Sequence, residues 1–363
     1  MNNYDVIIVG AGTAGLMLAR ELGRQKHKTL LLDRKKNILE FSFNTLGSFI
    51  NLEEFELPHS VVAQNIDTAV VHSKHLTEQI KVEAYVLDKK RVHQELIASL
   101  DTNFVEMQLG VHIKNISTIS AKNFTSVTDK NDNKFKAKIF VDASGTIGAL
   151  SKKIGLIPKT TELATGVEYN VKYFGNNSDA HLMIGKDYKG GYGWIFPLKN
   201  KRAIIGFGTF DKSMVKGLKD NLHRILKLPN IKKLVEKDND IVEGASIPIT
   251  PVIEKFVKGN FVCVGDSVSQ VNPIVGEGYK FIFESAIMAS RAINQSLIKN
   301  DLTLLLNYEI EWKKRFSSNY KRSKKAQERI FSLSKNDFLI DFGIILLKLR
   351  SNKKNVQTLS GEY

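Results

Sequence analysis

The sequence predicts an α/β fold in which a nucleotide-binding unit with a parallel sheet is interleaved with a unit built on an antiparallel sheet. Three observations predict it. A buried strand, a glycine-rich turn, a helix and a second buried strand open the chain over residues 4–33. Short apolar segments within residues 159–251 indicate antiparallel strands. A buried strand at 260–266, followed by a helix, returns to the first pattern. We therefore expect the nucleotide-binding unit to be assembled from both ends of the chain.

This order of patterns predicts where the domains begin and end. The nucleotide-binding domain is expected to be discontinuous, over residues 1–158 and 252–300, with an inserted mixed segment at about 45–88. The antiparallel-sheet domain is expected over 159–251. Residues 301–363 are expected to form a basic helical C-terminal region.

Composition and charge exclude several classes of protein. Hydrophobic residues make up 42% of the 363 residues, which is typical of a globular chain. The net charge of +15 can attract anionic partners. The basic residues are spread out and no nucleic-acid motif is present, so we expect no nucleic-acid partner. An anionic membrane surface remains a candidate partner.

The chain is expected to be cytoplasmic. The first strand begins at about Tyr4, which leaves no room for a signal peptide. The single cysteine, Cys263, fits a reducing compartment and lies in an apolar run typical of a core thiol.

The C-terminal region could also lie at the periphery of a membrane. The longest apolar stretch, 338–349, is interrupted by Asp341 and Lys348 and is too short to span a bilayer. Together with the basic residues of the tail it could lie at a membrane surface, or it could be a helix that packs on the body of the protein. After Arg350 we expect a loose polar end.

The first turn carries a phosphate-binding motif. Residues 10–15, Gly-Ala-Gly-Thr-Ala-Gly, have the G-x-G-x-x-G spacing between a strand and a helix. The free N–H groups of the helix would face a pyrophosphate, and a carboxylate at the end of the second strand can accept hydrogen bonds from a ribose. The residues expected to contact the adenosine diphosphate portion of a dinucleotide are Gly10, Gly12, Ala14, Gly15, Asp33 and Arg34.

Two later segments favour FAD over NAD as the dinucleotide. One is the run 142–145, Asp-Ala-Ser-Gly, and the other is Gly265-Asp266, each at the end of a predicted strand. Because FAD is long, its ribityl and flavin parts need contacts far from the first glycine turn. Asp266 can accept from the ribityl hydroxyls, and Gly276 and Gly278 can bring backbone N–H groups to the flavin.

These stretches resemble the flavoprotein superfamily that includes p-hydroxybenzoate hydroxylase, and most of all the geranylgeranyl reductases. The resemblance covers about residues 1–300. It is carried by residues 10–15, Arg91 before a helix, residues 142–145, the run from Gly265-Asp266 through Asn272-Pro273 to Gly276-Glu277-Gly278, and residues 190–197, Gly-Gly-Tyr-Gly-Trp-Ile-Phe-Pro.

The resemblance implies a Rossmann-type FAD domain interleaved with an antiparallel substrate-binding sheet, and FAD as the cofactor. It also implies roles for individual residues. Arg91 would bind the FAD linker and Asp266 the ribityl chain. The residues implied at the flavin ring and along the cofactor are Gly145, Gly265, Pro273, Gly276 and Gly278. The residues implied at the border of the substrate cavity are Tyr192, Trp194 and Phe196.

The sequence departs from the family in three places. Ser267-Val268-Ser269 stands where many members have Ala-Ala-Gly, and Glu277 stands where many have glycine. The first 50 residues contain no cysteine, so a mechanism that uses a cysteine near the flavin is excluded. These departures leave the identity of the substrate open.

The function predicted from these features is reduction of isoprenoid C=C bonds, with hydride delivered from the reduced flavin to a prenyl lipid. An FAD-dependent monooxygenase or halogenase and a non-redox isoprenoid cyclase are the alternatives. The electron donor stays open between NAD(P)H, ferredoxin and reduced flavin. No histidine or acidic residue can be assigned a catalytic role from spacing, and we expect no metal site.

Overall fold

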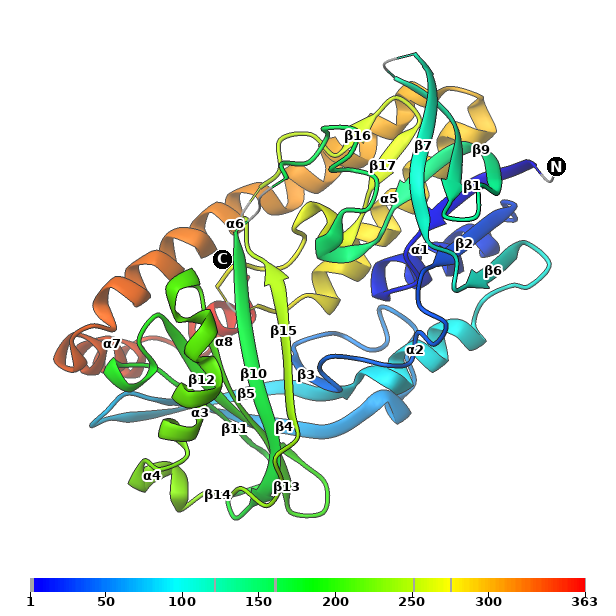
Figure 1. Ribbon diagram of the computed structural model, residues 1–363. Helices are drawn as coiled ribbons and strands as arrows, with labels where there is room; N and C mark the ends of the chain where they lie inside the picture. Colours follow the sequence, from blue (N-terminus) through cyan, green and yellow to red (C-terminus); the bar gives the residue numbers. More distant parts are fainter. Residues whose placement is uncertain (1–2, 121, 160–161, 251, 275, 363) are drawn as a thin grey trace.

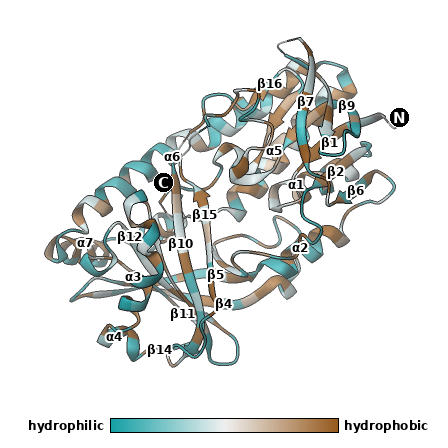
Figure 2. Ribbon diagram, in the orientation of Figure 1, coloured by the Kyte–Doolittle hydropathy of each residue, from teal (hydrophilic) through white to brown (hydrophobic). Residues whose placement is uncertain are grey.

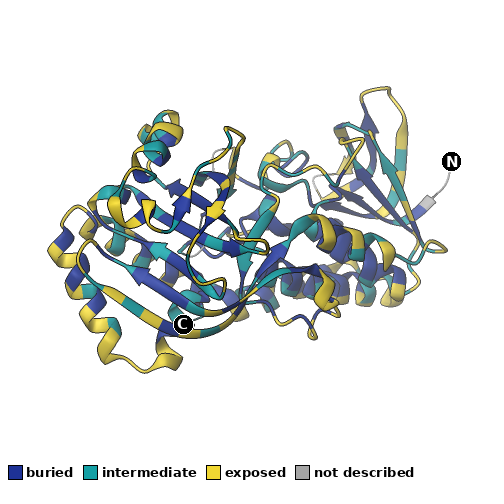
Figure 3. Cartoon of the chain, turned by 90° about the horizontal axis from the view of Figure 1, so that it is seen from below, coloured by how far each residue is buried: buried dark blue, intermediate teal, exposed yellow. Residues whose placement is uncertain are grey.

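Two large sheets form the two ends of the molecule, and a long C-terminal helix runs from one to the other (Figure 1). The computed structural model describes residues 3–120, 122–159, 162–250, 252–274 and 276–362. Buried residues concentrate in the strands, and exposed residues lie mainly on the outer helices and turns (Figure 3). The α/β class predicted from the sequence is confirmed.

The first sheet contains the nucleotide-binding pattern. Its central strands are all parallel, and the apolar side chains of β1 are buried because helices and loops cover both of its faces. The strands lie in the order β16 (Val257–Lys258), β17 (Phe261–Cys263), β9 (Lys134–Asp142), β1 (Asn3–Val9), β2 (Thr29–Asp33) and β6 (Val105–Leu109), with β8 (Asn123–Asp129) and β7 (Ile113–Ser120) added beside β9. Because β17 pairs with β9, a strand from late in the chain completes a sheet begun by its first residues (Figure 1).

The second sheet is antiparallel except where β11 pairs with β4. It includes the early segment near residues 45–88 as well as strands from 163–248. Its strands lie in the order β14 (Val235–Glu236), β10 (Leu163–Tyr173), β13 (Arg202–Thr209), β12 (Gly191–Leu198), β11 (Asp179–Met183), β4 (Val62–His72), β5 (Thr77–Asp88) and β3 (Thr45–Ser48), with β15 (Val242–Pro248) beside β10.

Helices cover both sheets. Hydrophobic residues are concentrated on the strands and helices around β1, β9 and α5 (Figure 2). The helix α6 carries Trp312, Phe316 and Tyr320 on one buried face, and Phe316 and Tyr320 pack against Phe281 of α5. The helices are α1 (Thr13–Arg24), α2 (Lys89–Ala98), α3 (Leu218–Ile225), α4 (Pro229–Lys232), α5 (Tyr279–Lys299), α6 (Leu306–Leu333), α7 (Asp337–Leu349) and α8 (Asn352–Leu359). Within the described residues, no helix combines the length and apolar character needed to cross a membrane.

The expectation of a loose end after Arg350 was wrong. Residues 352–359 form α8, which packs against β5, and Asn355 is buried. The carbonyl oxygen of Gly361 accepts hydrogen bonds from the side chains of Asn272 (2.9 Å) and Asn319 (2.8 Å). The polar composition of this segment was misleading because its asparagines and backbone find partners in distant parts of the chain.

Asp142 organises the turn that follows β9. Its carboxylate accepts hydrogen bonds from the backbone N–H groups of Ser144 (3.0 Å), Leu150 (3.0 Å) and Ser151 (2.7 Å), and from the Ser144 hydroxyl (2.5 Å). Asp142 is fully buried, so water cannot take the place of its carboxylate as the acceptor for these donors.

We therefore expect Asp142→Ala to lower the free energy of unfolding by about 3 kcal/mol or more, because several buried donors lose their acceptor. Urea denaturation followed by circular dichroism measures this. Glu236→Ala is the matched control, since its ion pair with Lys172 is exposed and its loss should cost less than about 1 kcal/mol. Equal midpoints for the two variants would contradict the assignment.

Candidate active site

The glycine turn between β1 and α1 is shaped by two close backbone contacts and one open space. A Cβ on Gly10 would lie 2.3 Å from the carbonyl oxygen of Ala143, and a Cβ on Gly15 would lie 1.8 Å from that of Gly10. Gly10 also has φ +114°, which side chains rarely adopt. A Cβ on Gly12 meets nothing within 4 Å. Two glycines therefore permit packing, and the third borders space that a ligand can enter.

The first turn of α1 is suited to an anion. Gly12 is the N-cap and offers no side chain to bind the free N–H groups of the helix. Asp33, at the end of β2, accepts from the N–H of Ala11 (2.7 Å) and of Lys35 (2.8 Å), which fixes the turn beside the helix. Arg34 is exposed next to it. This arrangement is typical of a pyrophosphate site.

A second glycine turn packs directly on the first. It follows β17, and a Cβ on Gly265 would lie 2.6 Å from the Cβ of Ala14. Gly265 has φ +74°, and Gly145 in the turn after β9 has φ +69°. The structure therefore brings together turns that are about 130 and 250 residues apart in sequence.

Asp266 carries an orphaned polar atom in this turn. Its Oδ1 is buried and has no hydrogen-bond partner among the described residues. Burial raises the pKa of its carboxyl group to about 6, although nearby Lys89 acts in the opposite direction. A buried carboxylate oxygen without a donor is costly unless a ligand supplies one, so Asp266 fits a ribityl hydroxyl.

The described residues of the loop 272–278 before α5, which are 272–274 and 276–278 and are called the flavin loop below, are held in a compact turn. Gly276 donates its N–H to the carbonyl of Asn272 (3.0 Å) and has φ +67°. The carbonyl of Pro273 accepts from Gln327 of α6. Gly278 is the N-cap of α5 and has no side chain to cap the helix. The loop therefore presents a free helix start at Gly278, as a flavin site would require, whereas the N–H of Gly276, which was expected to reach the flavin, already donates within the loop.

Arg91 lies at the start of α2 and is exposed. Its guanidinium donates to the carbonyl of Ser60 (3.0 Å) and forms an ion pair with Asp88 (3.4 Å). In the same helix, His93 is buried, and its Nε2 lies 3.1 Å from the hydroxyl of Thr13 in α1. Burial lowers the pKa of His93 to about 3, so it is neutral. The role of Arg91 at the FAD linker stays a prediction.

The three aromatic residues of β12 share one face of the strand but differ in what they touch. Tyr192 and Phe196 line a cavity, whereas Trp194 is not among its described lining residues. The indole of Trp194 lies over Gly206, where a Cβ would be only 2.2 Å from the ring, and its N–H donates to Glu168 (3.2 Å). Burial raises the pKa of Glu168 to about 8. Trp194 therefore supports the sheet between the two lining aromatics.

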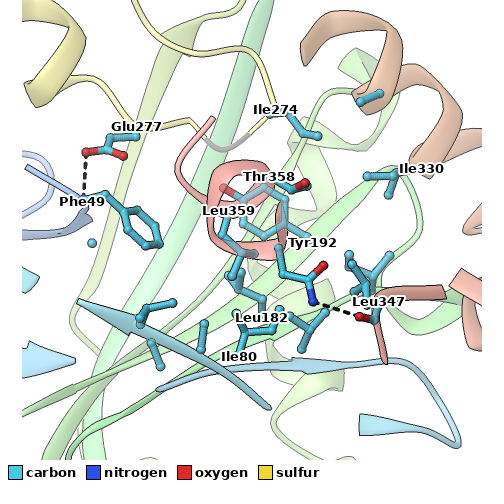
Figure 4. Close-up of a pocket in the computed structure, with 18 of the residues that line it drawn as sticks. Phe49, Ile80, Leu182, Tyr192, Ile274, Glu277, Ile330, Leu347, Thr358 and Leu359 are labelled. Atoms are coloured by element: carbon cyan, nitrogen blue, oxygen red, sulfur yellow. Dashed lines mark hydrogen bonds between the residues drawn. The ribbon is translucent and has the colours of Figure 1, made fainter. Parts of the chain in front are cut away.

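The cavity has a volume of about 750 Å³ and is mostly apolar. Sheet strands form its floor, α6, α7 and α8 form its opposite wall, and the loop 272–278 with the end of β3 closes the side toward the glycine turns. Figure 4 shows Glu277 and Phe49 on one side of the cavity and Leu347 on the opposite side. Representative lining residues from the floor and the helical wall are Val71, Ile80, Leu182, Ile330, Ile344 and Leu359.

The sequence analysis missed most of this cavity. The alternation of apolar residues in β4 and β5 could have indicated a buried face, since every second residue of a strand points the same way. The contribution of α7 and α8 had no comparable signal, because nothing local in a helix shows which distant sheet it covers.

The residues present fit FAD in three respects: the open space at Gly12, the uncapped start of α1, and the orphaned oxygen of Asp266. The described residues contain no group of three or more histidine, cysteine, aspartate or glutamate side chains that could hold a metal ion.

Comparison with known proteins identifies chains that are similar to this one. The family described as "Glucose inhibited division protein A" matches residues 5–174. The digeranylgeranylglycerophospholipid reductase of Methanococcus aeolicus is 27% identical over 87% of this chain and 83% of its own length. The corresponding reductase 3 of Methanosphaera stadtmanae is 26% identical over 83% of this chain and 80% of its own length.

The solved structures show the same fold. A geranylgeranyl bacteriochlorophyll reductase-like protein from Thermoplasma acidophilum superposes with a TM-score of 0.82 at 20% identity, covering 93% of this chain and 90% of that one. The chain is therefore similar in sequence to digeranylgeranylglycerophospholipid reductases and in fold to a geranylgeranyl reductase-like protein. The flavin-dependent brominase Bmp2 also superposes, with a TM-score of 0.77 at 16% identity over 99% of this chain and 94% of that one. The fold is thus common to reductases and halogenases.

These similarities confirm the predicted fold class, and they confirm FAD as the cofactor. The assignment of individual FAD contacts stays a proposal based on the geometry above. Gly12, which borders open space, and Gly15, which packs against backbone, provide a way to test this assignment.

We expect Gly12→Val to fold normally but to bind FAD at least about 100-fold more weakly, a loss of about 3 kcal/mol, because its side chain would enter the space left for the pyrophosphate. Isothermal titration of the apoprotein with FAD measures this. Gly15→Ala is the matched comparison, since its Cβ meets backbone and should lower stability by about 1–3 kcal/mol. If Gly12→Val retains wild-type affinity, the pyrophosphate does not lie at this turn.

Proposed function

We propose that the protein is an FAD-dependent reductase of C=C bonds in a prenyl lipid. The observation that carries the proposal is the shared boundary between two sites. The loop 272–278 belongs to the predicted flavin site and, together with the end of β3, also lines the apolar cavity. A substrate in the cavity would therefore meet the flavin edge without crossing water.

The size and lining of the cavity support an isoprenoid chain. Its volume of about 750 Å³ lies within the range of pockets that bury most of a ligand. The relatives from Methanococcus and Methanosphaera are named as digeranylgeranylglycerophospholipid reductases, which indicates the same class of substrate. A flexible hydrocarbon gains binding free energy from apolar contact along its whole length.

Cations at the edge of the cavity favour an anionic head group. Arg322, Lys325 and Arg329 are spaced three and four residues apart and so share one face of α6, and Arg350 follows α7. All four are exposed and line the cavity. A phosphate at this edge would be bound by several positive charges while the chain of the lipid lies inside.

When bound, FAD supplies the two electrons of the reduction as a hydride equivalent. The residues of the chain position the alkene and exclude water. Ile274 and Tyr192 line the cavity near the flavin loop, and Leu182 and Ile80 line its floor (Figure 4). Fixing the reacting atoms in this way lowers the entropic part of the barrier.

The test is anaerobic turnover with a geranylgeranyl glycerophospholipid. The reduced protein should regain its oxidised flavin absorbance only when the lipid is added, and mass spectrometry should show a gain of two hydrogens for each bond reduced. A lipid-independent reaction with oxygen that produces a hydroperoxide absorbance band would favour the monooxygenase or halogenase alternative and contradict the proposal.

We expect Leu182→Trp to raise the KM for the lipid at least about tenfold, because the larger side chain occupies the floor of the cavity. The FAD affinity should be unchanged, since β11 lies outside the glycine turns. The control is Leu198→Trp, because Leu198 ends β12 and is not among the described lining residues. Equal kinetics in the two variants would show that the substrate does not occupy the cavity.

A membrane surface is the further partner that we propose, and α7 is the element that would meet it. Phe338 (77% exposed), Phe342 (58%) and Leu349 (79%) lie on one face of this helix. The adjoining side of the helix is fixed to the β4–β5 hairpin through Asp341, which accepts from the hydroxyl of Ser73 (2.5 Å) and lies 2.7 Å from His75 Nδ1.

Basic residues flank this apolar face, which gives charge complementarity with an anionic bilayer. They are Lys335, Lys348, Arg350, Lys353 and Lys354. Each basic residue near anionic lipid contributes about 1 kcal/mol. Because α7 also forms a wall of the cavity, docking would place the entrance beside the lipid phase. A peripheral location on the cytoplasmic side stays a prediction.

We expect the triple variant Phe338→Ser, Phe342→Ser and Leu349→Ser to lower binding to phosphatidylglycerol vesicles at least about tenfold in a co-sedimentation assay. Binding of the wild type should weaken with added salt. The control is Ile119→Ser, an exposed apolar residue (80%) on the β7–β8 hairpin. If the triple variant and the control sediment equally, α7 is not the docking element.

A further inference from the structure

Glu277 lies where the flavin loop meets the apolar cavity. Its Oε1 accepts hydrogen bonds from the hydroxyl of Ser48 (2.6 Å) and from the N–H of Phe49 (3.0 Å) at the end of β3. The residue is 5% exposed and lines the cavity (Figure 4). These two bonds fix the side chain between the predicted flavin site and the second sheet.

The other oxygen of Glu277 has no partner. Oε2 is buried and makes no hydrogen bond among the described residues. Glu277 is also the single carboxylic acid among the described residues that line the cavity; the other ionisable groups there are the cations at the edge and two tyrosines. An unpaired charge on a buried carboxyl group at the wall of an apolar cavity would be costly, so the free oxygen favours a carboxyl group that holds a proton.

The surroundings of Glu277 favour its neutral form at moderate pH. Burial raises the pKa of its carboxyl group to about 7, and the hydrogen bonds from Ser48 and Phe49 act in the opposite direction. The charged groups that face it are Lys280, which lowers the pKa, and Glu362, which raises it. These two groups form an ion pair with each other (2.8 Å) and are partly exposed, so they connect the region of Glu277 to solvent.

We propose that Glu277 is the catalytic acid that protonates the alkene through Oε2. The inference rests on the proposed function. In the step, the alkene π bond breaks, one carbon accepts the hydride equivalent from reduced FAD, and the other carbon forms a C–H bond with the proton of the Glu277 carboxyl group. The reduced flavin ends oxidised, and the carboxylate left behind takes a proton from solvent. Glu277 thus supplies the one component of the reduction that the cofactor does not.

A purely structural role for Glu277, as a clamp between the loop and β3, makes a different prediction. Glu277→Gln keeps a side-chain oxygen that can accept from Ser48 and Phe49, but its amide cannot act as an acid. Ser48→Ala removes one bond of the clamp and leaves the acid in place. If the clamp alone matters, the serine variant should lose more activity than the glutamine variant.

The experiment is steady-state reduction of a geranylgeranyl glycerophospholipid by the holoenzyme, measured from pH 5 to pH 9. A positioned general acid contributes about 100-fold or more. We expect Glu277→Gln to lower kcat at least about 100-fold while KM and FAD affinity stay within about threefold. In the wild type, kcat should fall as pH rises through about 7, because the acid loses its proton, and this decline should be absent from the residual activity of the variant.

Infrared spectroscopy gives a readout that does not depend on turnover. Subtracting the spectrum of Glu277→Gln from that of the wild type should leave the C=O stretch of one protonated carboxyl group, which should titrate near pH 7 and shift when the lipid fills the cavity. Glu284→Gln is the control, since Glu284 is a partly buried acid on α5 that pairs with Arg315 and is not among the described lining residues. It should keep both the band and the activity.

The outcomes separate the two proposals. A wild-type protein that reduces no prenyl alkene would overturn both. An active wild type whose Glu277→Gln variant keeps kcat within threefold and the same pH profile would overturn only the role of Glu277. A greater loss of kcat in Ser48→Ala than in Glu277→Gln would also overturn only the role of Glu277 as the acid. It would show that Glu277 acts by holding the loop against β3.

Discussion

The buried amide of Asn272 connects the parts of the molecule that form the site. Its side chain donates to the hydroxyl of Ser323 on α6 (3.1 Å) and to the carbonyl of Gly361 (2.9 Å), and its side-chain oxygen accepts from the N–H of Ile274 (3.0 Å). The residue is fully buried, so each of these bonds replaces one that water would make. The loop 272–278 keeps its shape because of them, and this loop borders both the flavin site and the cavity.

The first sheet was largely predictable from the sequence. The runs at β1 and β2 are apolar throughout, as buried parallel strands require, and the glycines between them have roles that only their small size permits. The return of a buried strand near residue 261 could be recognised for the same reason. These elements can be predicted from local patterns, because residues close together in the sequence determine each strand and each turn.

The rest depended on contacts between residues far apart in sequence. Trp194 was expected at the cavity together with Tyr192 and Phe196, but its place over Gly206 follows from the register between β12 and β13, which no single segment reveals. The order of α8 likewise depends on partners about 90 and 40 residues away along the chain. The sequence showed that Glu277 stands where many family members have glycine. Its position at the wall of the cavity, bonded to Ser48 and Phe49, could not be predicted because those residues are far from it in sequence.

The bond between Asn272 and Gly361 has a consequence for how the protein is made. A ribosome delivers the chain from its first residue onward, and β17, α5, α6 and α8 emerge after almost all of the second sheet. The first sheet cannot receive β17 beside β9, and the flavin loop cannot take its final shape, until these late segments are available. Folding of the site is therefore expected to wait for these segments and to be slow, since it requires closing loops of more than 100 residues. During synthesis, the apolar floor formed by β4, β5 and β11 would be uncovered, and a chaperone or an early ligand could shield it.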